Sequence, residues 1–430
     1  MTLHETITAG SCGCDAAELA SGLISYDEAL HAITTLAAPE LEIENLALSQ
    51  ARGRVLAHSC VTSHPLPPFD RAAMDGYAVS SKAFQGQGPW TLQVADRVTA
   101  GSAARHDIRE QTAAQIFTGA PVPDGADAII MQEKVNRSDD HILIDRAPRY
   151  GENIRYAGEE CAANSEVLAV GTRLGPREIA ACAAIGKTTL SVKRPLKVAL
   201  LVTGNEVLDT SFPAGQTPPH AMIHDVNTPL LQAEMARPDI ELHVVQHVPD
   251  QRDTLQELLG QLAQTVDLIV TTGGLSVGEE DHVRPAWQNL GGQITFSGVA
   301  IKPGKPVSLG KLGTCHWLGL PGNPLAAFVT WQLFGKPLVH RLTQARGHAV
   351  SRRQLVLSQP VAHKPGRCEF RPATIVRCDG LGRELVEADT ATHSGQVTGL
   401  PHRDGVILIP GDIDHLPAGA LVDFFPFSNC

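Results

Sequence analysis

The stretch DLIVTTGGLSVGEED, residues 267–281, indicates the fold class of this chain. Residues 266–270 form an apolar run with the length and residue types of a buried parallel strand. The run leads to Gly273 and Gly274, where the absence of Cβ atoms lets the backbone turn sharply and lets a ligand approach its N–H groups. The carboxylates of residues 279–281 follow directly. Taken alone, a surface turn before a negatively charged helix start would give the same pattern.

The segments on both sides of this stretch alternate strands with helices, which is the pattern of a doubly wound α/β domain. Pro324 is expected in the first position of a helix that continues to about Arg341. The expected strands cover residues 197–202, 240–248, 266–270 and 316–320. Because parallel strands end at the same edge of a sheet, the turns that follow these strands should lie close together.

Three residues at expected helix starts have side chains that accept hydrogen bonds from a first helical turn: Asn227, Asp250 and Asn323. For Asp250, capping is the alternative to a role in ligand binding. Pro285 is expected in the first turn of a shortened helix.

The N-terminal part begins with a loose segment, after which Ser25 and Glu28 have the spacing of a capping box. Apolar residues at helical spacing follow, so a helix is expected from about Ser25. A second helical piece is expected over residues 46–57. The prolines of residues 65–68 then form a rigid connector, which indicates a domain boundary.

Short alternating runs with many glycines and prolines follow this connector, which is typical of β structure. A strand is expected over residues 126–132, and the loop of residues 117–123 is stiffened by proline and suited to hold a small ligand. The charged residues 149–160 fit a solvated face. The expected organisation is a flexible tail (1–20), a linker domain (21–68 and 160–194), a β-rich inserted domain (69–159), an α/β domain (195–345) and a small C-terminal β domain (346–430).

Composition excludes several classes of function. A formal net charge of -11 over 430 residues argues against a general nucleic-acid binder. Nine scattered cysteines do not form a disulfide framework and suit a reducing compartment. Cys12 and Cys14 form the one close pair, which fits a flexible tail better than a metal site because no second pair follows. No signal peptide and no apolar window of membrane-spanning length is present, so we expect a cytoplasmic protein without membrane contact.

Two familiar nucleotide motifs do not fit this chain. Lys305 follows Gly304 as in a phosphate loop, but Pro306 stands where that motif has Ser or Thr. No GxGxxG fingerprint is present either. His220 and His224 are four residues apart, but the prolines around them argue against a helical metal pair.

Six motifs occur in order along the chain: AAMDGYAV, FTGAPVP, TGNE, TTGGLSVGEED, AIKPGKP and LPGNP. Together they resemble the molybdopterin molybdenumtransferases, including the C-terminal domain of gephyrin, over nearly the whole chain. The resemblance implies an elongated homodimer of four-domain subunits. It also implies an active site between the α/β molybdopterin-binding domain of one subunit and the second domain of the other.

The resemblance further implies a reaction that joins molybdate to the dithiolene of adenylylated molybdopterin and releases AMP, with Mg²⁺ as the metal. An upstream adenylyltransferase is a possible partner. Pyrophosphate cleavage needs Mg²⁺ held by hard oxygen ligands. The expected catalytic residues are Asp75, Thr118, Glu206, Asp250 and Asp281, and all of them except Thr118 are also expected metal ligands. The expected binding residues are Arg155, Gly273, Gly274, Ser276, Lys302, Lys305, Pro321, Asn323, Pro324 and Arg367.

The chain departs from the family pattern at several positions where a carboxylate, cation or hydroxyl is common. These positions are Asn205, Glu160, Thr228, Gly298, Ala326 and Gln396. A non-catalytic or weakly active paralogue that binds a pterin or nucleotide is therefore the alternative to a working enzyme. An unrelated nucleotide enzyme of similar fold is a third possibility.

Overall fold

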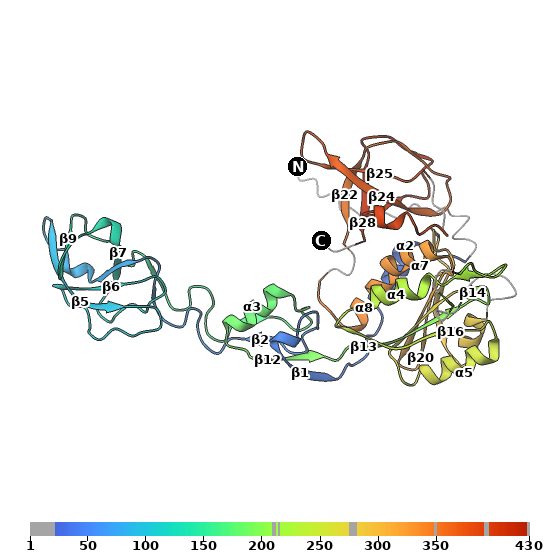
Figure 1. Cartoon of the computed structure of the whole chain (residues 1–430), viewed down its shortest axis with the longest axis horizontal. Coiled ribbons are helices and arrows are strands. Elements are labelled where there is room, and N and C mark those ends of the chain that lie inside the picture. Colours follow the sequence, from blue (N-terminus) through green and yellow to red (C-terminus); the bar gives the residue numbers. More distant parts are fainter. Residues whose placement is uncertain are drawn as a thin grey trace, which may run out of the picture.

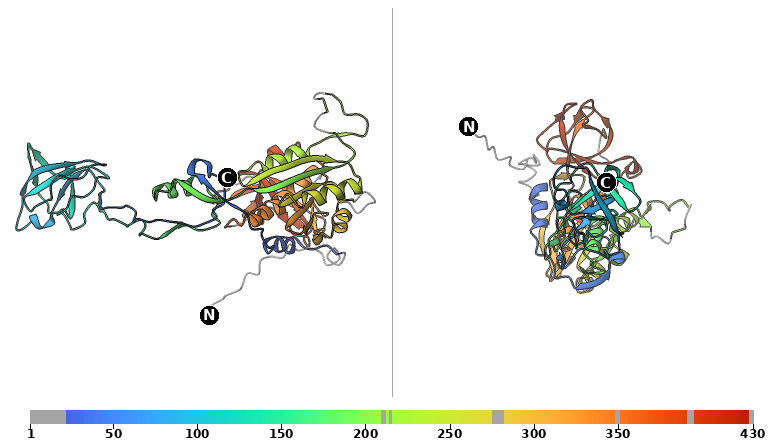
Figure 2. Two further views of the ribbon diagram at one scale, coloured as in Figure 1. Left: turned by 90° about the horizontal axis from the view of Figure 1, so that it is seen from below. Right: turned by 90° about the vertical axis from the view of Figure 1, so that its left-hand side faces the viewer.

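A computed structural model of the chain describes residues 22–208, 212–213, 216–274, 282–347, 351–390 and 395–427. The molecule is elongated (Figure 1). A β-rich lobe over residues 71–155, here called the distal lobe, lies at one end, and a larger body lies at the other. Two extended segments and a small linker region join them, as Figure 2 shows from a second direction.

A six-stranded mixed sheet forms the centre of the larger body. Its strands, in spatial order, are β16 (Ile240–Val248), β13 (Leu196–Thr203), β17 (Leu268–Thr272), β21 (Cys315–Leu320), β20 (Ser308–Leu312) and β18 (Gln293–Ser297). The first four strands are parallel to one another, β20 is antiparallel to β21, and β18 is antiparallel to β20. All four expected strands of the α/β domain are confirmed. The apolar runs of β13, β17 and β21 are buried from both faces of the sheet, whereas β16 lies at its edge and is mostly exposed or half-buried.

Helices cover both faces of this sheet. Alternate residues of β13 point to opposite sides: Val198 and Leu200 pack with α4 (Asn227–Met235) and α7 (Pro324–Thr330), and the residues between them pack with the other pair of helices. That other pair is α5 (Arg252–Leu262) and α6 (Val283–Asn289). The prediction of a doubly wound α/β fold is confirmed.

The helix predicted from Pro324 to about Arg341 is present but contains an irregular turn. After α7 the chain forms a π-helical turn, Trp331–Gly335, and continues into α8 (Lys336–Leu342). A Cβ at Gly335 would lie 2.2 Å from the ring of Trp331, so the bulky indole fits only beside a glycine. Pro285 lies in the first turn of α6, as expected.

Helix α2 (Tyr26–Thr34) begins with the predicted capping box. The Ser25 N–H donates to Glu28 Oε2 at 2.8 Å, and the Glu28 N–H donates to Ser25 Oγ at 3.2 Å. The ring of Tyr26 packs edge-on against Phe370 at 5.0 Å, and its burial raises the pKa of its hydroxyl. Although the sequence placed this helix in the linker domain, it packs in the core shared by the α/β sheet and the C-terminal strands.

The linker region contains two short antiparallel pairs and one helix. Strand β1 (Ile43–Ala47) pairs with β12 (Thr189–Lys193), β2 (Cys60–Val61) pairs with β11 (Glu166–Leu168), and α3 covers Pro176–Ala184. The predicted helix over residues 46–57 is wrong, because this segment forms the end of β1 and a 3₁₀ turn at Leu48–Gln50. Gly53, with φ +81° and a Cβ position 2.7 Å from Pro238, ends any helical continuation.

The distal lobe is built on one six-stranded sheet. Its strands, in spatial order, are β7 (Ala128–Met131), β4 (Gly76–Val79), β6 (Thr112–Ile116), β5 (Trp90–Val98), β9 (His141–Ile144) and β8 (Asn136–Ser138). Separate apolar clusters cover its two faces. A smaller pair, β3 (Arg71–Ala72) with β10 (Ile154–Arg155), lies where the lobe meets the connectors. The strand predicted over residues 126–132 is confirmed as β7.

The C-terminal unit is a closed ring of strands, here called the C-terminal barrel. Its strands are β22 (Arg353–Leu357), β24 (Cys368–Cys378), β25 (Glu384–Ala388), β26 (Gly405–Ile409) and β28 (Leu421–Pro426). Because β24 pairs with both β25 and β26, the ring closes and leaves few free edges. The short strand β19 (Ile301–Lys302) adds to β24 in parallel, which brings Lys302 next to the barrel.

No helix in the described parts of the chain is long and apolar enough to cross a membrane. The six cysteines within those parts are free thiols.

Candidate functional site

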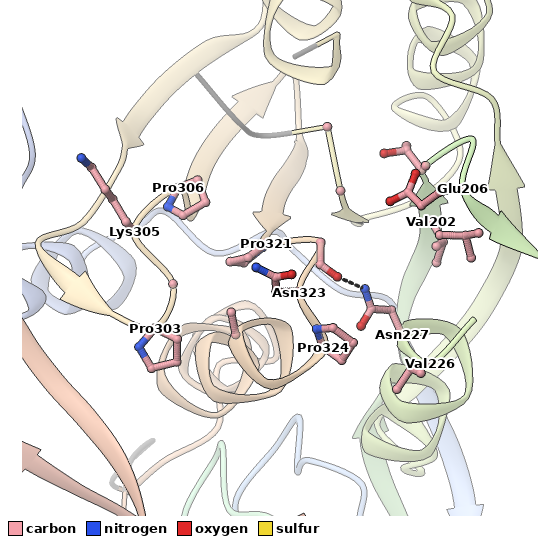
Figure 3. A pocket seen from close by; sticks show the side chains of 18 of the residues that line it. Val202, Glu206, Val226, Asn227, Pro303, Lys305, Pro306, Pro321, Asn323 and Pro324 are labelled. Atoms are coloured by element: carbon pink, nitrogen blue, oxygen red, sulfur yellow. Dashed lines mark hydrogen bonds between the residues drawn. The ribbon is translucent and has the colours of Figure 1, made fainter. Parts of the chain in front are cut away.

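A cavity of about 1210 Å³ lies at the carboxyl ends of β13, β17 and β21. Ten of the residues predicted from the sequence line it. Toward the strand ends these are Glu206, Asp250, Gly273, Gly274, Pro321, Asn323 and Pro324, and on the opposite wall they are Lys302, Lys305 and Arg367. Figure 3 shows this division: Lys305 lies on one side, Glu206 and Val202 on the other, and the Pro321–Pro324 loop between them.

Glycine is required where the strand ends meet. Gly273 has φ +91°, and a Cβ there would lie 2.6 Å from the carbonyl oxygen of Thr203. A Cβ at Gly322 would in turn lie 3.4 Å from Gly273 Cα. The ends of β13, β17 and β21 therefore approach each other closely only because side chains are absent.

The acidic side of the cavity is organised by Asn205 and Asp250. The Asn205 N–H donates to Asp250 Oδ2 at 3.1 Å, and the Asp250 N–H donates to Asn205 Oδ1 at 3.3 Å. Asp250 Oδ1 is buried and accepts no hydrogen bond in the described part of the chain. The capping role considered for Asp250 is wrong, because α5 begins after Gln251 without a side-chain cap. The exposed carboxylate of Glu206 lies beside Asn205 and folds back over Gly204.

The cationic side of the cavity is connected to the C-terminal barrel. Lys302 Nζ lies 3.4 Å from Glu369 Oε1, and Arg367 Nη1 donates to the carbonyl of Ile301 at 3.2 Å. Lys305 extends from the same loop and has no ion-pair partner among the described residues. Three cations thus lie on one wall of a cavity whose opposite side holds carboxylates.

Glu369 is the centre of a buried ionic cluster behind this wall. Its side chain is 1% exposed, and it accepts hydrogen bonds from Arg371 Nε at 3.2 Å and Nη2 at 2.8 Å. His363 Nε2 lies 3.6 Å from Glu369 Oε2. Because Glu369 also contacts Lys302, this cluster fixes one cation of the cavity against the barrel.

Asn227 was predicted to cap a helix, and this is wrong. Helix α4 begins after Val226 without a side-chain cap, and the Asn227 amide instead donates to Thr272 Oγ1 at 2.9 Å and to the Gly322 carbonyl at 2.7 Å. Asn323 does precede Pro324 at the start of α7, as expected, although its side chain makes no capping bond. Asn227 therefore ties two strand ends together at the floor of the cavity.

The remaining predicted residues of the described chain lie on the distal lobe or its edge. The Thr118 hydroxyl donates to Asp75 Oδ1 at 2.7 Å, and the Thr118 N–H donates to the same oxygen at 2.8 Å. These two bonds hold the pKa of the exposed Asp75 carboxyl below its ordinary value. Arg155 is exposed and lies 3.6 Å from Glu159. Figures 1 and 2 show the whole distal lobe far from the α/β sheet of its own chain.

Ser276 and Asp281 lie outside the described residues, as do the neighbouring carboxylates of residues 279–280. Within the described ranges, no group of three or more His, Cys, Asp or Glu side chains is placed to hold a metal ion. The four predicted metal ligands are thus divided: Glu206 and Asp250 line the cavity, Asp75 lies on the distal lobe, and Asp281 is not described.

The six positions that depart from the family pattern also fall into two groups. Asn205, Gly298 and Ala326 line the cavity, whereas Glu160, Thr228 and Gln396 do not. Gly298 has φ +89°, and a Cβ there would lie 2.6 Å from Leu23 Cδ2, so Leu23 covers the space above it. Leu23 also lines the cavity. Gln396 is exposed and is not among the residues that line the cavity.

Three residues with roles at the cavity were not predicted: Leu23, Asn227 as a strand-end tie, and Glu369. The sequence places Asn227 directly after the loop that carries Asp225, which could have indicated a role at the cavity. The same position before a helical segment also fits a helix cap. No local pattern marks Leu23 or Glu369, whose partners come from distant segments.

Comparison with known proteins agrees with this geometry. The MoeA N-terminal region, domains I and II, matches residues 24–186, and a probable molybdopterin binding domain matches residues 199–341. A molybdopterin molybdenumtransferase from Staphylococcus epidermidis is 30% identical over 391 residues, covering 89% of this chain and 91% of the relative. One from Haemophilus influenzae is 34% identical over 304 residues, covering 70% of this chain and 73% of the relative.

A solved structure shows the same architecture. The molybdopterin biosynthesis moeA protein from Pyrococcus horikoshii superimposes with a TM-score of 0.80 at 27% identity, covering 94% of this chain and 100% of that protein. Sequence relatives and a structural relative therefore agree along nearly the whole length, from the distal lobe to the barrel. This chain belongs to the molybdopterin molybdenumtransferase family of molybdenum cofactor biosynthesis.

Proposed function

We propose that this chain inserts molybdate into adenylylated molybdopterin and releases AMP, at a site that two subunits complete. The proposal rests on one observation: the predicted site residues lie in two separate places of the same chain. The cavity is lined by four cations (Arg284, Lys302, Lys305 and Arg367) and three carboxylates (Glu206, Asp225 and Asp250), while Asp75 and Thr118 are preorganised on a lobe that does not reach the cavity of its own chain. A second copy would bring its distal lobe to this cavity, in keeping with the two-fold symmetry common among homo-oligomers.

The cationic wall suits the anionic parts of such a substrate. Lys302, Lys305 and Arg367 supply fixed positive charge where molybdate and the phosphates would bind. Their position on one loop and one barrel edge keeps them apart from the carboxylates of the opposite side. The anionic groups of the substrate would thus be oriented before any bond changes.

The acidic side is suited to hold Mg²⁺. Asp250 has a buried carboxylate oxygen without a hydrogen-bond donor in the described chain, and Glu206 adds an exposed carboxylate, so both offer the hard oxygens that Mg²⁺ prefers. Asp281 and the partner's Asp75 would complete the ligand set. Bound Mg²⁺ would neutralise charge on the pyrophosphate that is cleaved. Asn205 would keep Asp250 oriented through their reciprocal bonds.

Mixed dimers test the shared site. Asp75→Asn and Asp250→Asn should each abolish molybdate-dependent AMP release when present in both subunits. When equal amounts of the two variants are allowed to exchange subunits, half of the dimers carry one intact site, so about a quarter of the parental activity should return. A matched control mixes Asp250→Asn with Glu206→Gln, which damage the same cavity and should not complement. Light scattering should give twice the subunit mass of 45.8 kDa.

The reaction itself is tested with purified substrate. AMP release should require both molybdate and Mg²⁺, and the protein should restore activity to molybdoenzymes in cells that lack their own insertion enzyme. Binding without AMP release would instead identify a non-catalytic paralogue, which the loss of a carboxylate at Asn205 and of a hydroxyl at Ala326 would explain. We further propose that an upstream adenylyltransferase supplies the substrate and that the protein acts in the cytoplasm.

A further inference from the structure

At the end of the cavity opposite Lys305, a buried amide lies beside apolar side chains, and the carboxylates of Glu206 and Asp225 line the same cavity. Val202 and Val226 lie beside Asn227 at this end (Figure 3), and Ile223 lines the same cavity. We propose that Asn227 Oδ1 accepts a hydrogen bond from an exocyclic amino group on a nitrogen heterocycle, and so selects the heterocyclic part of the substrate. The assignment rests on the proposed function for the identity of that substrate.

The orientation of the Asn227 amide is fixed by its neighbours. The Thr272 hydroxyl donates to the Pro321 carbonyl at 2.9 Å, so its oxygen can only accept from Asn227. The Gly322 carbonyl is also an acceptor. Both partners therefore require the nitrogen of the amide, and a flipped amide would place its oxygen against two oxygens. The oxygen Oδ1 must face the other way.

Oδ1 has no hydrogen-bond donor in the described chain. Asn227 is 7% exposed, and its Oδ1 is one of the buried side-chain atoms without a partner. Buried polar atoms in folded proteins are nearly always paired, so an orphaned acceptor in the wall of a cavity indicates a donor that arrives with a ligand. Thr272 and Gly322 are engaged in holding the strand ends and do not compete for it.

The chemistry of the ligand follows from the acceptor and its surroundings. An amide oxygen does not bind molybdate or the pyrophosphate diester of such a substrate, which offer oxygens and no donor at neutral pH. The valines around it favour a flat apolar ring. An amino-substituted heterocycle meets both conditions, and both halves of an adenylylated pterin carry one. Both halves share the exocyclic amino group, so an experiment must decide which half binds at Asn227.

Calorimetric titration with two ligand pairs tests the assignment. AMP is compared with purine riboside 5′-monophosphate, which lacks the 6-amino group, and a pterin is compared with the pteridin-4-one that lacks the 2-amino group. The parental protein should bind the amino form of one pair about tenfold more tightly. The pair that shows the preference identifies the adenylate or the pterin as the half that binds at Asn227.

Two variants separate recognition from structure. Asn227→Ala should bind both members of that pair equally, whereas Thr272→Val should lower thermal stability and keep the preference, because Gly322 still orients the amide. The parental comparison alone decides the matter if Asn227→Ala does not fold. No preference in either pair, no binding of either pair at millimolar concentration, or a preference that survives in Asn227→Ala would overturn the assignment.

These titrations do not depend on turnover. A protein that discriminates the amine but releases no AMP would refute the proposed function and leave the role of Asn227 standing. A protein that releases AMP without discriminating the amino group would support the proposed function and refute the role of Asn227.

Discussion

Glu369→Gln should destabilise the C-terminal barrel strongly, and a matched change in the same unit should not. Glu369 and Arg371 form an ion pair with a nitrogen–oxygen distance of 2.8 Å and side chains that are 1% and 5% exposed. Glu384 and Arg353 form one at 2.9 Å with side chains that are 36% and 45% exposed. The two pairs share residue types, distance and barrel, but the Glu369 pair is buried and its carboxylate also lies near Lys302 and His363.

The expected magnitudes follow from this difference in burial. Removing one partner of a buried pair leaves the other charge without compensation and costs about 3–5 kcal/mol. The glutamine side chain of the Glu369→Gln variant would still accept one hydrogen bond from Arg371, so we expect the lower end, about 3 kcal/mol. Glu384→Gln breaks a solvent-exposed pair and should cost about 0–1 kcal/mol.

Native-state hydrogen exchange of the β24 amides measures this locally, which matters because a multidomain chain does not unfold in two states. A loss of about 3 kcal/mol corresponds to exchange about 150-fold faster. Equal effects of Glu369→Gln and Glu384→Gln would refute the reasoning, since burial would then not decide the contribution of the pair. A large effect of Glu384→Gln alone would refute it equally.

Three further predictions concern the two halves of the site. Ala326→Ser should place a hydroxyl in the cavity wall and tighten molybdate binding about tenfold in calorimetric titration, and unchanged affinity would show that the oxyanion binds elsewhere. Lys305→Ala should weaken molybdate binding by about 10-fold to 150-fold, whereas Lys311→Ala, outside the cavity, should leave it unchanged. Thr118→Val should raise the pKa of Asp75 toward 3.8 in an NMR titration. Because the folded pKa of Asp75 is lowered, its stabilisation is present above pH 3.8 and lost as the pH falls through the folded pKa, and a titration unchanged in the variant would contradict this cause.

The α/β core was predictable from sequence because its three central parallel strands are buried on both faces. Each reads as a short apolar run, and the run leads into Gly, Pro or a polar residue. Strand 196–203 was located to within a residue for this reason, whereas the edge strand 240–248 is only partly buried and was recognised by its end before Pro249. The segment over residues 46–57 has apolar residues spaced ambiguously, and its strand pairing with β12, more than a hundred residues away, overrode its helical appearance.

The cavity residues were predictable as a group because the topology collects strand ends at one edge. The role of each residue in the cavity was harder to predict from the sequence. Asn227 and Asp250 both stand where a helix cap is expected, yet their side chains bond to Gly322 and Asn205 on other strand ends. The role of Glu369 depends on β19 joining β24, a contact that sequence spacing does not encode.

Gly298 and Leu23 limit the routes by which this cavity can change through mutation. A side chain at Gly298 would occupy a positive-φ conformation, which costs about 1–3 kcal/mol, and would meet Leu23 at 2.6 Å. A lysine at position 298 therefore requires the end of the Leu23 side chain to move aside, and a smaller residue at position 23 removes that requirement. The two positions, far apart in sequence, form an epistatic pair: a lysine at position 298 costs less stability when residue 23 is small, and it would add a cation to the four that already line the cavity.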